Sequence, residues 1–181
     1  MIININFKDT YPPINLEDDF LTMTFESPQK DGSNQLLLVK IDHHNDPLLP
    51  NVYNLGFGPP NGQGGFLDDV RLKHVNIHRV LSTVLFHSLN FLELHTGTAM
   101  GIDGSDDLRA ALYHHVFRSN RAYLGQFFTA TGVDWYVRIF RDGRYEQDEY
   151  GYYIAKPRPE LFDYRRTRQD LYRYYIFRLN E

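Results

Sequence analysis

One long amphipathic helix constrains the fold of this chain more than any other sequence feature. Between Asn76 and Gly97, apolar side chains recur at the i, i+3, i+4 spacing of a helix face, at Ile77, Val80, Leu81, Val84, Leu85, Leu89 and Leu92. Asparagine is a favoured first cap of a helix, and glycine is favoured just after its end. Further apolar residues widen the arc, at Phe86, Phe91 and Leu94. The segment therefore predicts a helix that is well buried against a sheet.

Segments with the alternation of half-buried strands lie on both sides of this helix. Four precede it, at residues 21–27, 35–41, 52–57 and 66–72, and a short one follows at 98–102. A second helix is predicted over 106–117, and then further strands at 122–129, 135–140, 145–155 and 171–179. Arg141-Asp-Gly-Arg144 is a strong hairpin signal, and Lys156-Pro-Arg-Pro159 is expected to end that hairpin. This order predicts an α+β fold, a mostly antiparallel sheet of about seven to nine strands with two helices packed on it.

Length and composition fit one domain over residues 1–181 and exclude several classes of site. The chain has 181 residues and no cysteine, which excludes thiolate zinc sites and a cysteine nucleophile. No run approaches the roughly 20 apolar residues of a membrane-spanning helix. The N-terminus lacks the basic and apolar regions of a secretory signal. We therefore expect a cytoplasmic protein that does not engage a membrane.

The net charge of −4 hides an asymmetry between the two parts of the chain. Residues 1–108 carry 6 Lys/Arg and 14 Asp/Glu, a net of −8, whereas residues 109–181 carry 13 and 9, a net of +4. Twelve of those 13 cations are arginines, which suit two-point contacts with phosphate or carboxylate. The two parts either complement each other within the fold or present a positive face to an anionic partner.

The turn and helix at Gly101–His115 form the first candidate site. Ser105 follows a glycine and is expected to cap the helix, whose free N–H groups attract anions. Arg109 and Tyr113 are four residues apart and share a helix face, so they can clamp an anion together with His114. The alternative is a well-capped helix with a local Asp106–Arg109 ion pair.

The arginine-rich C-terminal part is the second candidate. Arg165, Arg166 and Arg168 precede a segment, 171–179, that alternates arginines with aromatic residues. Single-stranded nucleic acid is bound by such pairs, phosphate on arginine and base on ring. The alternative is an ordinary edge strand with its arginines pointing outward.

Other sites have weaker support, and we expect no metal and no cofactor. His43 and His44 with Asp42 and Asp46, or His74 and His78 with Asp103 or Asp106, have poor spacing for a closed metal site. Arg109 and His114 share the Arg-x4-His spacing of a class of ribonucleases, but that fold is all-helical. No phosphate-binding loop, dinucleotide fingerprint, nucleophile elbow or zinc-protease motif is present. The residues therefore name no catalytic group.

Several motifs together resemble an uncharacterised family of small bacterial proteins, described only as a domain of unknown function. They are Val52-Tyr-Asn-Leu-Gly-Phe-Gly58, Asp68-Asp69, Arg79-Val-Leu-Ser-Thr-Val84, Gly104-Ser105, Arg109 and Leu112-Tyr113. The resemblance covers about residues 50–118. The family usually has a second arginine where this chain has Ala111. The resemblance implies no mechanism, because the family has no established activity.

The element order is also similar to the later part of the acyl-CoA-dependent N-acetyltransferase fold. Ala110-Ala-Leu-Tyr113 followed by Val116-Phe117 resembles that fold's last helix. Those enzymes bind pyrophosphate at a glycine-rich turn before their long helix, whereas Lys73-His-Val-Asn-Ile-His-Arg79 has no glycine. This resemblance implies an acyltransferase with Tyr113 as the general acid.

From the sequence, the leading hypothesis is a protein that binds an anionic ligand, either nucleic acid or a nucleotide. A setting in toxin–antitoxin systems or phage defence is a hypothesis from size and family type alone. The alternatives are an acyltransferase-like enzyme and a protein-interaction module that uses an exposed aromatic C-terminal strand. The last alternative includes association with a partner protein or as a homo-oligomer.

Overall fold

A single eight-stranded sheet organises the molecule. The computed structural model describes residues 2–43, 46–67, 70–104 and 106–180. The strands are β1 Asn15–Leu16, β2 Thr22–Pro28, β3 Asn34–His43, β4 Val52–Gly58, β5 Ala99–Asp103, β6 Phe128–Val137, β7 Ala155–Leu161 and β8 Tyr174–Leu179. The helices are α1 Ile77–Leu94, α2 Asp107–Ser119 and the short α3 Arg121–Leu124. The α+β prediction is confirmed, with one more helix than expected.

The strand order is β1-β2-β3-β4-β5-β8-β6-β7, and every neighbouring pair is antiparallel except β4 and β5. Helix α1 forms the crossover that this parallel pair requires. The β4–β5 ladder covers only Val52↔Ala99, Tyr53↔Met100 and Asn54↔Gly101. Beyond Asn54, β4 continues to Gly58 without pairing to β5, so the sheet opens between them.

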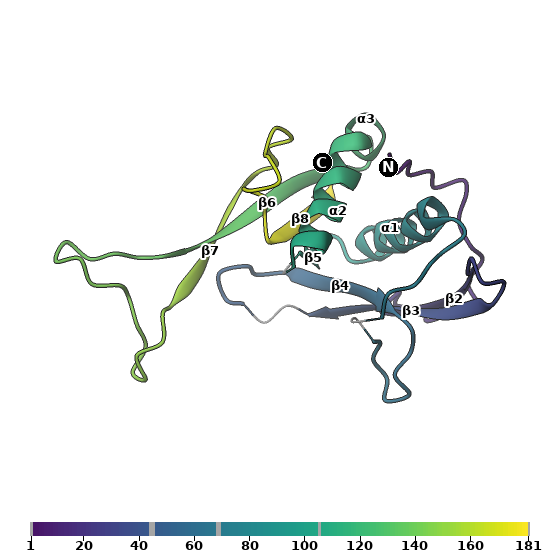
Figure 1. Cartoon of the computed structure of the whole chain (residues 1–181), viewed down its shortest axis with the longest axis horizontal. Helices are drawn as coiled ribbons and strands as arrows, with labels where there is room; N and C mark the ends of the chain where they lie inside the picture. Colours follow the sequence, from purple (N-terminus) through teal and green to yellow (C-terminus); the bar gives the residue numbers. More distant parts are fainter. Residues whose placement is uncertain (1, 44–45, 68–69, 105, 181) are drawn as a thin grey trace.

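Helices α1 and α2 lie over the same face of the sheet (Figure 1). The predicted N-cap of α1 is confirmed, since Asn76 accepts a hydrogen bond from the backbone N–H of Arg79. An extended N-terminal segment covers the outer side of the helices and buries Ile3, Ile5 and Phe7. Its backbone donates to Asn120 at 2.8 Å and to Ser82 at 3.0 Å. Helix α1 is thus apolar on more than one face because both the sheet and this segment pack against it.

Two predicted strands are absent from the sheet. The segment 122–129 begins within helix α3, which follows Asn120 and ends at Gly125, and only the last two residues of the segment join β6. In the segment 66–72, Phe66 forms an isolated bridge with Pro60, and the other described residues join no strand. Residues 68 and 69 lie outside the described part of the chain.

The prediction that the prolines at 157 and 159 end the hairpin is wrong, because both lie inside edge strand β7. The backbone N–H of Phe162 donates to Ala130 across the ladder. Alternation along the strand therefore turns the even-numbered N–H groups of β7 toward β6 and leaves positions 157 and 159 on the outer edge. No donor is needed there, so proline is tolerated.

The C-terminal strand β8 is an interior strand between β5 and β6, so the prediction of an edge strand is also wrong. Residues Tyr174 to Phe177 are all buried. Tyr175 and Phe177 join the main core under the helices, and Tyr174 and Ile176 join a smaller cluster with Leu49, Val52 and Val133. Burial on both faces explains the density of aromatic residues in this segment.

Between β6 and β7, residues 138–154 form an arm that projects from the body (Figure 1). The Asp-Gly hairpin is confirmed at its tip, where the Phe140 N–H donates to Arg144 at 2.8 Å and Gly143 has φ +84°. A second turn follows at Gly151, also at φ +84°. The strands predicted at 135–140 and 145–155 are therefore mostly replaced by two short hairpins.

Candidate functional site

A cavity of about 570 Å³ lies where β4 and β5 diverge. Strands β3 and β4, helix α2 and the start of β8 supply most of its walls. The described lining residues are Lys40, Asp42, Asn54, Leu55, Gly56, Phe57, Phe66, Val70, Asp103, Arg109, Leu112, Tyr113, Trp135, Arg173 and Tyr174. Two of the residues predicted as a site, Arg109 and Tyr113, are thus brought together here.

Helix α2 places these two side chains because its start is fixed by a cap. Asp106 Oδ1 accepts hydrogen bonds from the backbone N–H groups of Leu108 at 2.9 Å and Arg109 at 2.8 Å. The cap is therefore Asp106 rather than Ser105, which lies outside the described residues. The predicted ion pair is confirmed, with 3.2 Å between Arg109 Nε and Asp106 Oδ2. Tyr113 follows one turn later on the same face of α2.

The phenol of Tyr113 stays protonated at neutral pH. Burial raises the pKa of Tyr113 to about 12, against the opposing effect of the Arg109 charge. The carboxylates of Asp103 and Asp106 raise this pKa further. Tyr113 is thus a hydrogen-bond donor at the cavity wall.

The cavity wall carries three cations and two carboxylates among the described residues. Lys40 Nζ lies 3.1 Å from Asp42 Oδ1. Arg173 Nη1 lies 2.7 Å from Asp107 Oδ1 at the first turn of α2. The side chains of both pairs are between about a third and four-fifths exposed, so each pair contributes little to stability.

Two glycines let aromatic rings approach the strands at the cavity. A Cβ on Gly56 of β4 would lie 2.2 Å from Cζ of Phe66. A Cβ on Gly101 of β5 would lie 2.0 Å from the hydroxyl of Tyr174. That hydroxyl donates to Asn54 Oδ1 and so connects β8 with β4. The cavity is lined by rings because these glycines leave room for them.

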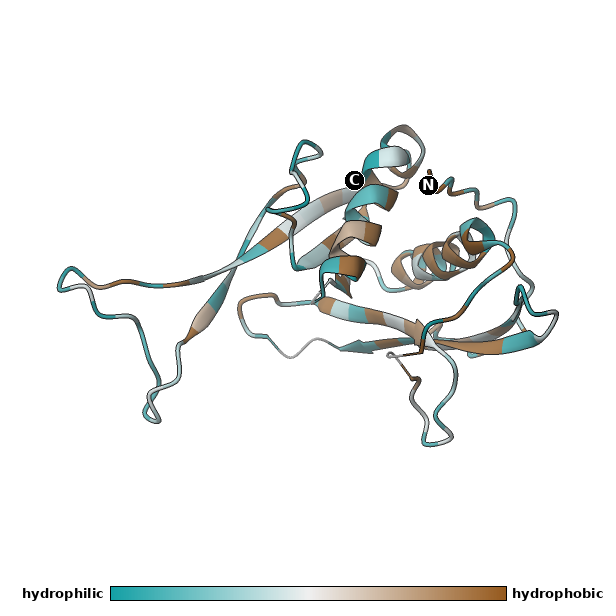
Figure 2. Ribbon diagram, in the orientation of Figure 1, coloured by the Kyte–Doolittle hydropathy of each residue, from teal (hydrophilic) through white to brown (hydrophobic). Residues whose placement is uncertain are grey.

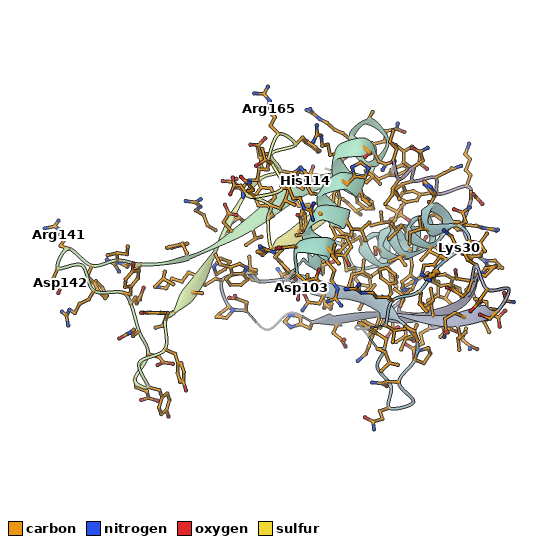
Figure 3. All side chains as sticks on the ribbon, in the orientation of Figure 1. Lys30, Asp103, His114, Arg141, Asp142 and Arg165 are labelled. Atoms are coloured by element: carbon orange, nitrogen blue, oxygen red, sulfur yellow. The ribbon has the colours of Figure 1, made fainter. Side chains whose placement is uncertain are left out.

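The three C-terminal arginines do not reach this cavity. Arg166 is nearly buried and forms a double hydrogen bond to Asp134, at 2.8 and 2.7 Å. It also contacts Glu160 at 2.7 Å and lies over the ring of Tyr172, 3.7 Å from its centre. Arg165 and Arg168 are exposed, and Figure 3 shows Arg165 pointing away from the body. Arg166 thus joins elements of the fold together.

His114 lies on the other side of α2 from the cavity. It is 5% exposed and stacks on Phe162 with ring centres 5.1 Å apart. Burial, followed by the nearby Arg118, lowers the pKa of His114, so its ring is neutral at neutral pH. The structure therefore separates His114 from Arg109 and Tyr113.

Sequence reasoning missed the part of the site that comes from distant strands. Lys40, Asn54, Trp135 and Arg173 belong to four different segments, and no local motif connects them. Strand order supplies the connection, because β8 inserts beside β5 and brings residue 173 to the start of α2. A sequence signal existed only for Arg109 and Tyr113, which share one helix.

The described residues were also compared with the requirements of a metal site and of a membrane-spanning helix. Within 2–43, 46–67, 70–104 and 106–180, no three His, Asp or Glu side chains are arranged to hold a metal ion. Over those same ranges, no helix is long and apolar enough to cross a membrane.

A family model matches residues 8–157, which is most of the chain. The chain belongs to DUF6934, a family of unknown function. The part shared with DUF6934 extends beyond the motifs at 50–118 and includes β2 to β6, α1 and α2. It holds every described cavity residue from Lys40 to Trp135, whereas Arg173 and Tyr174 lie after it. No curated protein and no solved structure matches the chain.

Proposed function

We propose that this chain binds a small anionic organic molecule, of about the size of a mononucleotide, in the cavity between β4 and β5. The observation that carries the proposal is the convergence of Lys40, Arg109 and Arg173 on one cavity of about 570 Å³. That volume lies within the range of roughly 300–1,000 Å³ that is typical of small-molecule sites.

The polar groups of the cavity suit a phosphate or carboxylate. Arginine presents paired N–H groups that match the oxygens of such anions. Lys40 and Arg173 each face a carboxylate across an exposed pair, and a ligand anion can take the place of that carboxylate. The protonated hydroxyl of Tyr113 adds a neutral donor.

The apolar part of the cavity suits a flat ring. Phe57, Phe66 and Trp135 line the same space as the cations. Aromatic side chains bind planar groups by stacking and edge contacts. A nucleotide combines a phosphate with such a ring, and we therefore choose it as the first probe.

A small ligand accounts for the arrangement better than a nucleic-acid chain. The polymer hypothesis relied on Arg166 and on the aromatic residues of the last strand. Arg166 is engaged with Asp134 and Glu160, and Tyr175 and Phe177 are fully buried. These groups serve the fold, whereas Lys40, Arg109 and Arg173 line one cavity.

Isothermal titration calorimetry with adenosine monophosphate, adenosine and inorganic phosphate tests the proposal. We expect saturable binding of adenosine monophosphate, and roughly tenfold weaker binding by Arg109→Gln or Arg173→Gln, because each loses a charge-assisted contact. Arg165→Gln, an exposed arginine outside the cavity, is the matched control and should bind as the wild type does. Binding of all three arginine variants with unchanged affinity would place the ligand elsewhere.

A second candidate is acyl transfer, which the position of Tyr113 favours. Its protonated hydroxyl lies at the opening between β4 and β5, together with the carboxylate of Asp103. In such a reaction Asp103 would accept a proton from an attacking amine, and Tyr113 would donate one to the departing thiolate.

The start of α1 argues against a coenzyme A site of the usual kind. Arg79 in its first turn contacts Asp9 at 3.2 Å and the Thr10 carbonyl at 2.8 Å. His78 accepts a hydrogen bond from the Asn4 backbone at 2.9 Å. The N-terminal segment thus packs against this helix start. A thermal shift assay with millimolar acetyl-CoA tests whether the protein binds this coenzyme, because a ligand bound to the folded state raises the unfolding temperature.

A further inference from the structure

The arm at residues 138–154 exposes an unusual number of aromatic side chains. Tyr150, Tyr152 and Tyr153 are 78%, 72% and 63% exposed. Ile139, Phe140 and Tyr145 are exposed as well. Figure 2 shows short hydrophobic stretches on the arm between longer hydrophilic ones. Tyrosine and other aromatic residues are enriched at protein interfaces, so these side chains indicate a contact surface.

The arm has a defined shape although it projects from the body. The Glu146 N–H donates to the Arg138 carbonyl at 2.8 Å, and the Ile154 N–H donates to the Glu146 carbonyl at 3.0 Å. Asp148 Oδ1 accepts from the backbone of Tyr150 and Tyr152, each at 2.9 Å. An isolated two-stranded ribbon is marginally stable in water. A preformed ribbon that exposes its rings gains stability from a partner.

Opposite charges separate between the two hairpins of the arm. The first hairpin, residues 138–144, carries Arg138, Arg141 and Arg144 against one Asp, a net of +2. The second hairpin, residues 146–154, carries only the acids Glu146, Asp148 and Glu149, a net of −3. Two copies of the arm that lie side by side in opposite directions about a two-fold axis can pair each positive hairpin with the negative hairpin of the other copy.

The same charges argue against other partners. The whole arm has three arginines and four carboxylates, a net of −1, which disfavours a nucleic acid or an anionic membrane surface. Addition of a strand to the edge of β7 is disfavoured because Pro157 and Pro159 occupy its outer positions. The contact must therefore use side chains of the arm.

We propose that the arm at residues 138–154 is a dimerisation element that binds the arm of a second copy of this chain. Its tyrosines form the apolar centre of the contact, and the Arg141 and Glu149 hairpins of the two copies face each other. The interface is isologous, so each charge pair occurs twice.

Sedimentation velocity over a series of protein concentrations tests this proposal. We expect the full chain to approach twice its mass of 21.3 kDa as the concentration rises. Arg141→Glu alone and Glu149→Arg alone place like charges together and should each raise the dimer dissociation constant at least tenfold. The double variant Arg141→Glu with Glu149→Arg restores opposite charges and should dimerise nearly as well as the wild type.

Two controls make the result decisive. Arg165→Glu changes an exposed charge outside the arm and should leave the dissociation constant unchanged. Circular dichroism shows that each variant is folded. The proposal is overturned if the wild type stays monomeric over the whole concentration series, or if the double variant fails to recover dimerisation. Dimerisation that persists when residues 138–154 are replaced by Asn-Gly also overturns it.

Discussion

The ring of Tyr174 on β8 packs directly over Gly101 on the neighbouring strand β5. A Cβ at residue 101 would lie 2.0 Å from the Tyr174 hydroxyl and 2.3 Å from Cζ. The same hydroxyl donates to Asn54 on β4, at the last residue of the β4–β5 ladder. This contact holds three strands in place at the point where the sheet opens into the cavity.

We predict that Gly101→Ala lowers the free energy of unfolding by about 1–3 kcal/mol, because the added methyl group displaces the buried Tyr174 ring. Urea denaturation measures the loss. In a Tyr174→Ala background the same change should cost much less, since the obstructing ring is gone. Equal costs in the two backgrounds would show that the ring does not limit residue 101.

Arg166→Ala should destabilise the fold strongly. It removes the double contact with Asp134 and the contact with Glu160, and leaves Asp134 with the longer, 3.5 Å contact to the exposed Arg158. Because both carboxylates are partly exposed, we expect the free energy of unfolding to fall by about 1–3 kcal/mol. The matched control Arg165→Ala changes an exposed side chain and should shift the free energy of unfolding by less than about 0.5 kcal/mol.

The contact of Arg166 with Asp134 also gives a pH dependence. The Arg166 hydrogen bonds lower the pKa of Asp134 below its ordinary value of 3.8. A carboxyl group whose pKa is lowered in the folded state stabilises the fold fully at pH values above its pKa in the unfolded state. This stabilisation is lost as the pH falls through its pKa in the folded state. The stability difference between the wild type and Asp134→Asn should therefore shrink below about pH 4. A difference that stays constant down to pH 2 would contradict this account.

His87 predicts a second loss of stability at mildly acidic pH. It is 2% exposed within α1, and burial lowers the pKa of His87 to about 4 from the ordinary 6.5. Between pH 6.5 and 4 the unfolded state binds more protons at His87 than the folded state does. The stability of the fold is therefore unaffected by His87 above about pH 6.5 and decreases as the pH falls toward 4. We expect the loss from His87 between pH 7 and 5 to be about 2 kcal/mol.

Denaturation of His87→Gln at both pH values measures this contribution. The variant should lose less stability between pH 7 and 5 than the wild type, because glutamine takes up no proton. His115→Gln, on the more exposed side of α2, is the control and should follow the wild type. If His87→Gln and the wild type lose the same amount, His87 is not neutral and buried as described.

Tyr113→Phe should weaken binding of adenosine monophosphate without unfolding the protein. The change removes one donor to the ligand, which corresponds to about 0.5–1.5 kcal/mol or a few-fold in dissociation constant. Since the pKa of Tyr113 is raised to about 12, the wild-type affinity should show no contribution from its ionisation between pH 7 and 9. Calorimetry at both pH values tests the two statements.

Local sequence patterns predicted those helices and strands whose bounds are set by hydrophobic periodicity and by capping residues. The helix between Asn76 and Gly97, the short strand at 98–102 and the helix that carries Arg109 were all predicted within a few residues. The Asp-Gly turn was predicted as well, because a tight hairpin turn needs a residue with positive φ and glycine adopts it readily. Gly143 has this positive φ in the structure. The pairing of Arg109 and Tyr113 on one face followed from their spacing alone.

Features that depend on strand order were not available from local patterns. Nothing near Arg166 indicates that Asp134 lies beside it, so its arginine neighbours suggested an external ligand. The interior position of β8 likewise depends on its insertion between β5 and β6. Proline at 157 and 159 suggested a break because the direction of each N–H group is known only once the register is known.

A crystal structure of the protein grown with saturating adenosine monophosphate tests the central claim most directly. The account predicts the phosphate in the cavity between β4 and β5, with its oxygens about 3 Å from nitrogens of Arg109 or Arg173. An empty cavity, or a nucleotide bound at another surface while Arg109 and Arg173 keep their pairs with Asp106 and Asp107, would contradict it.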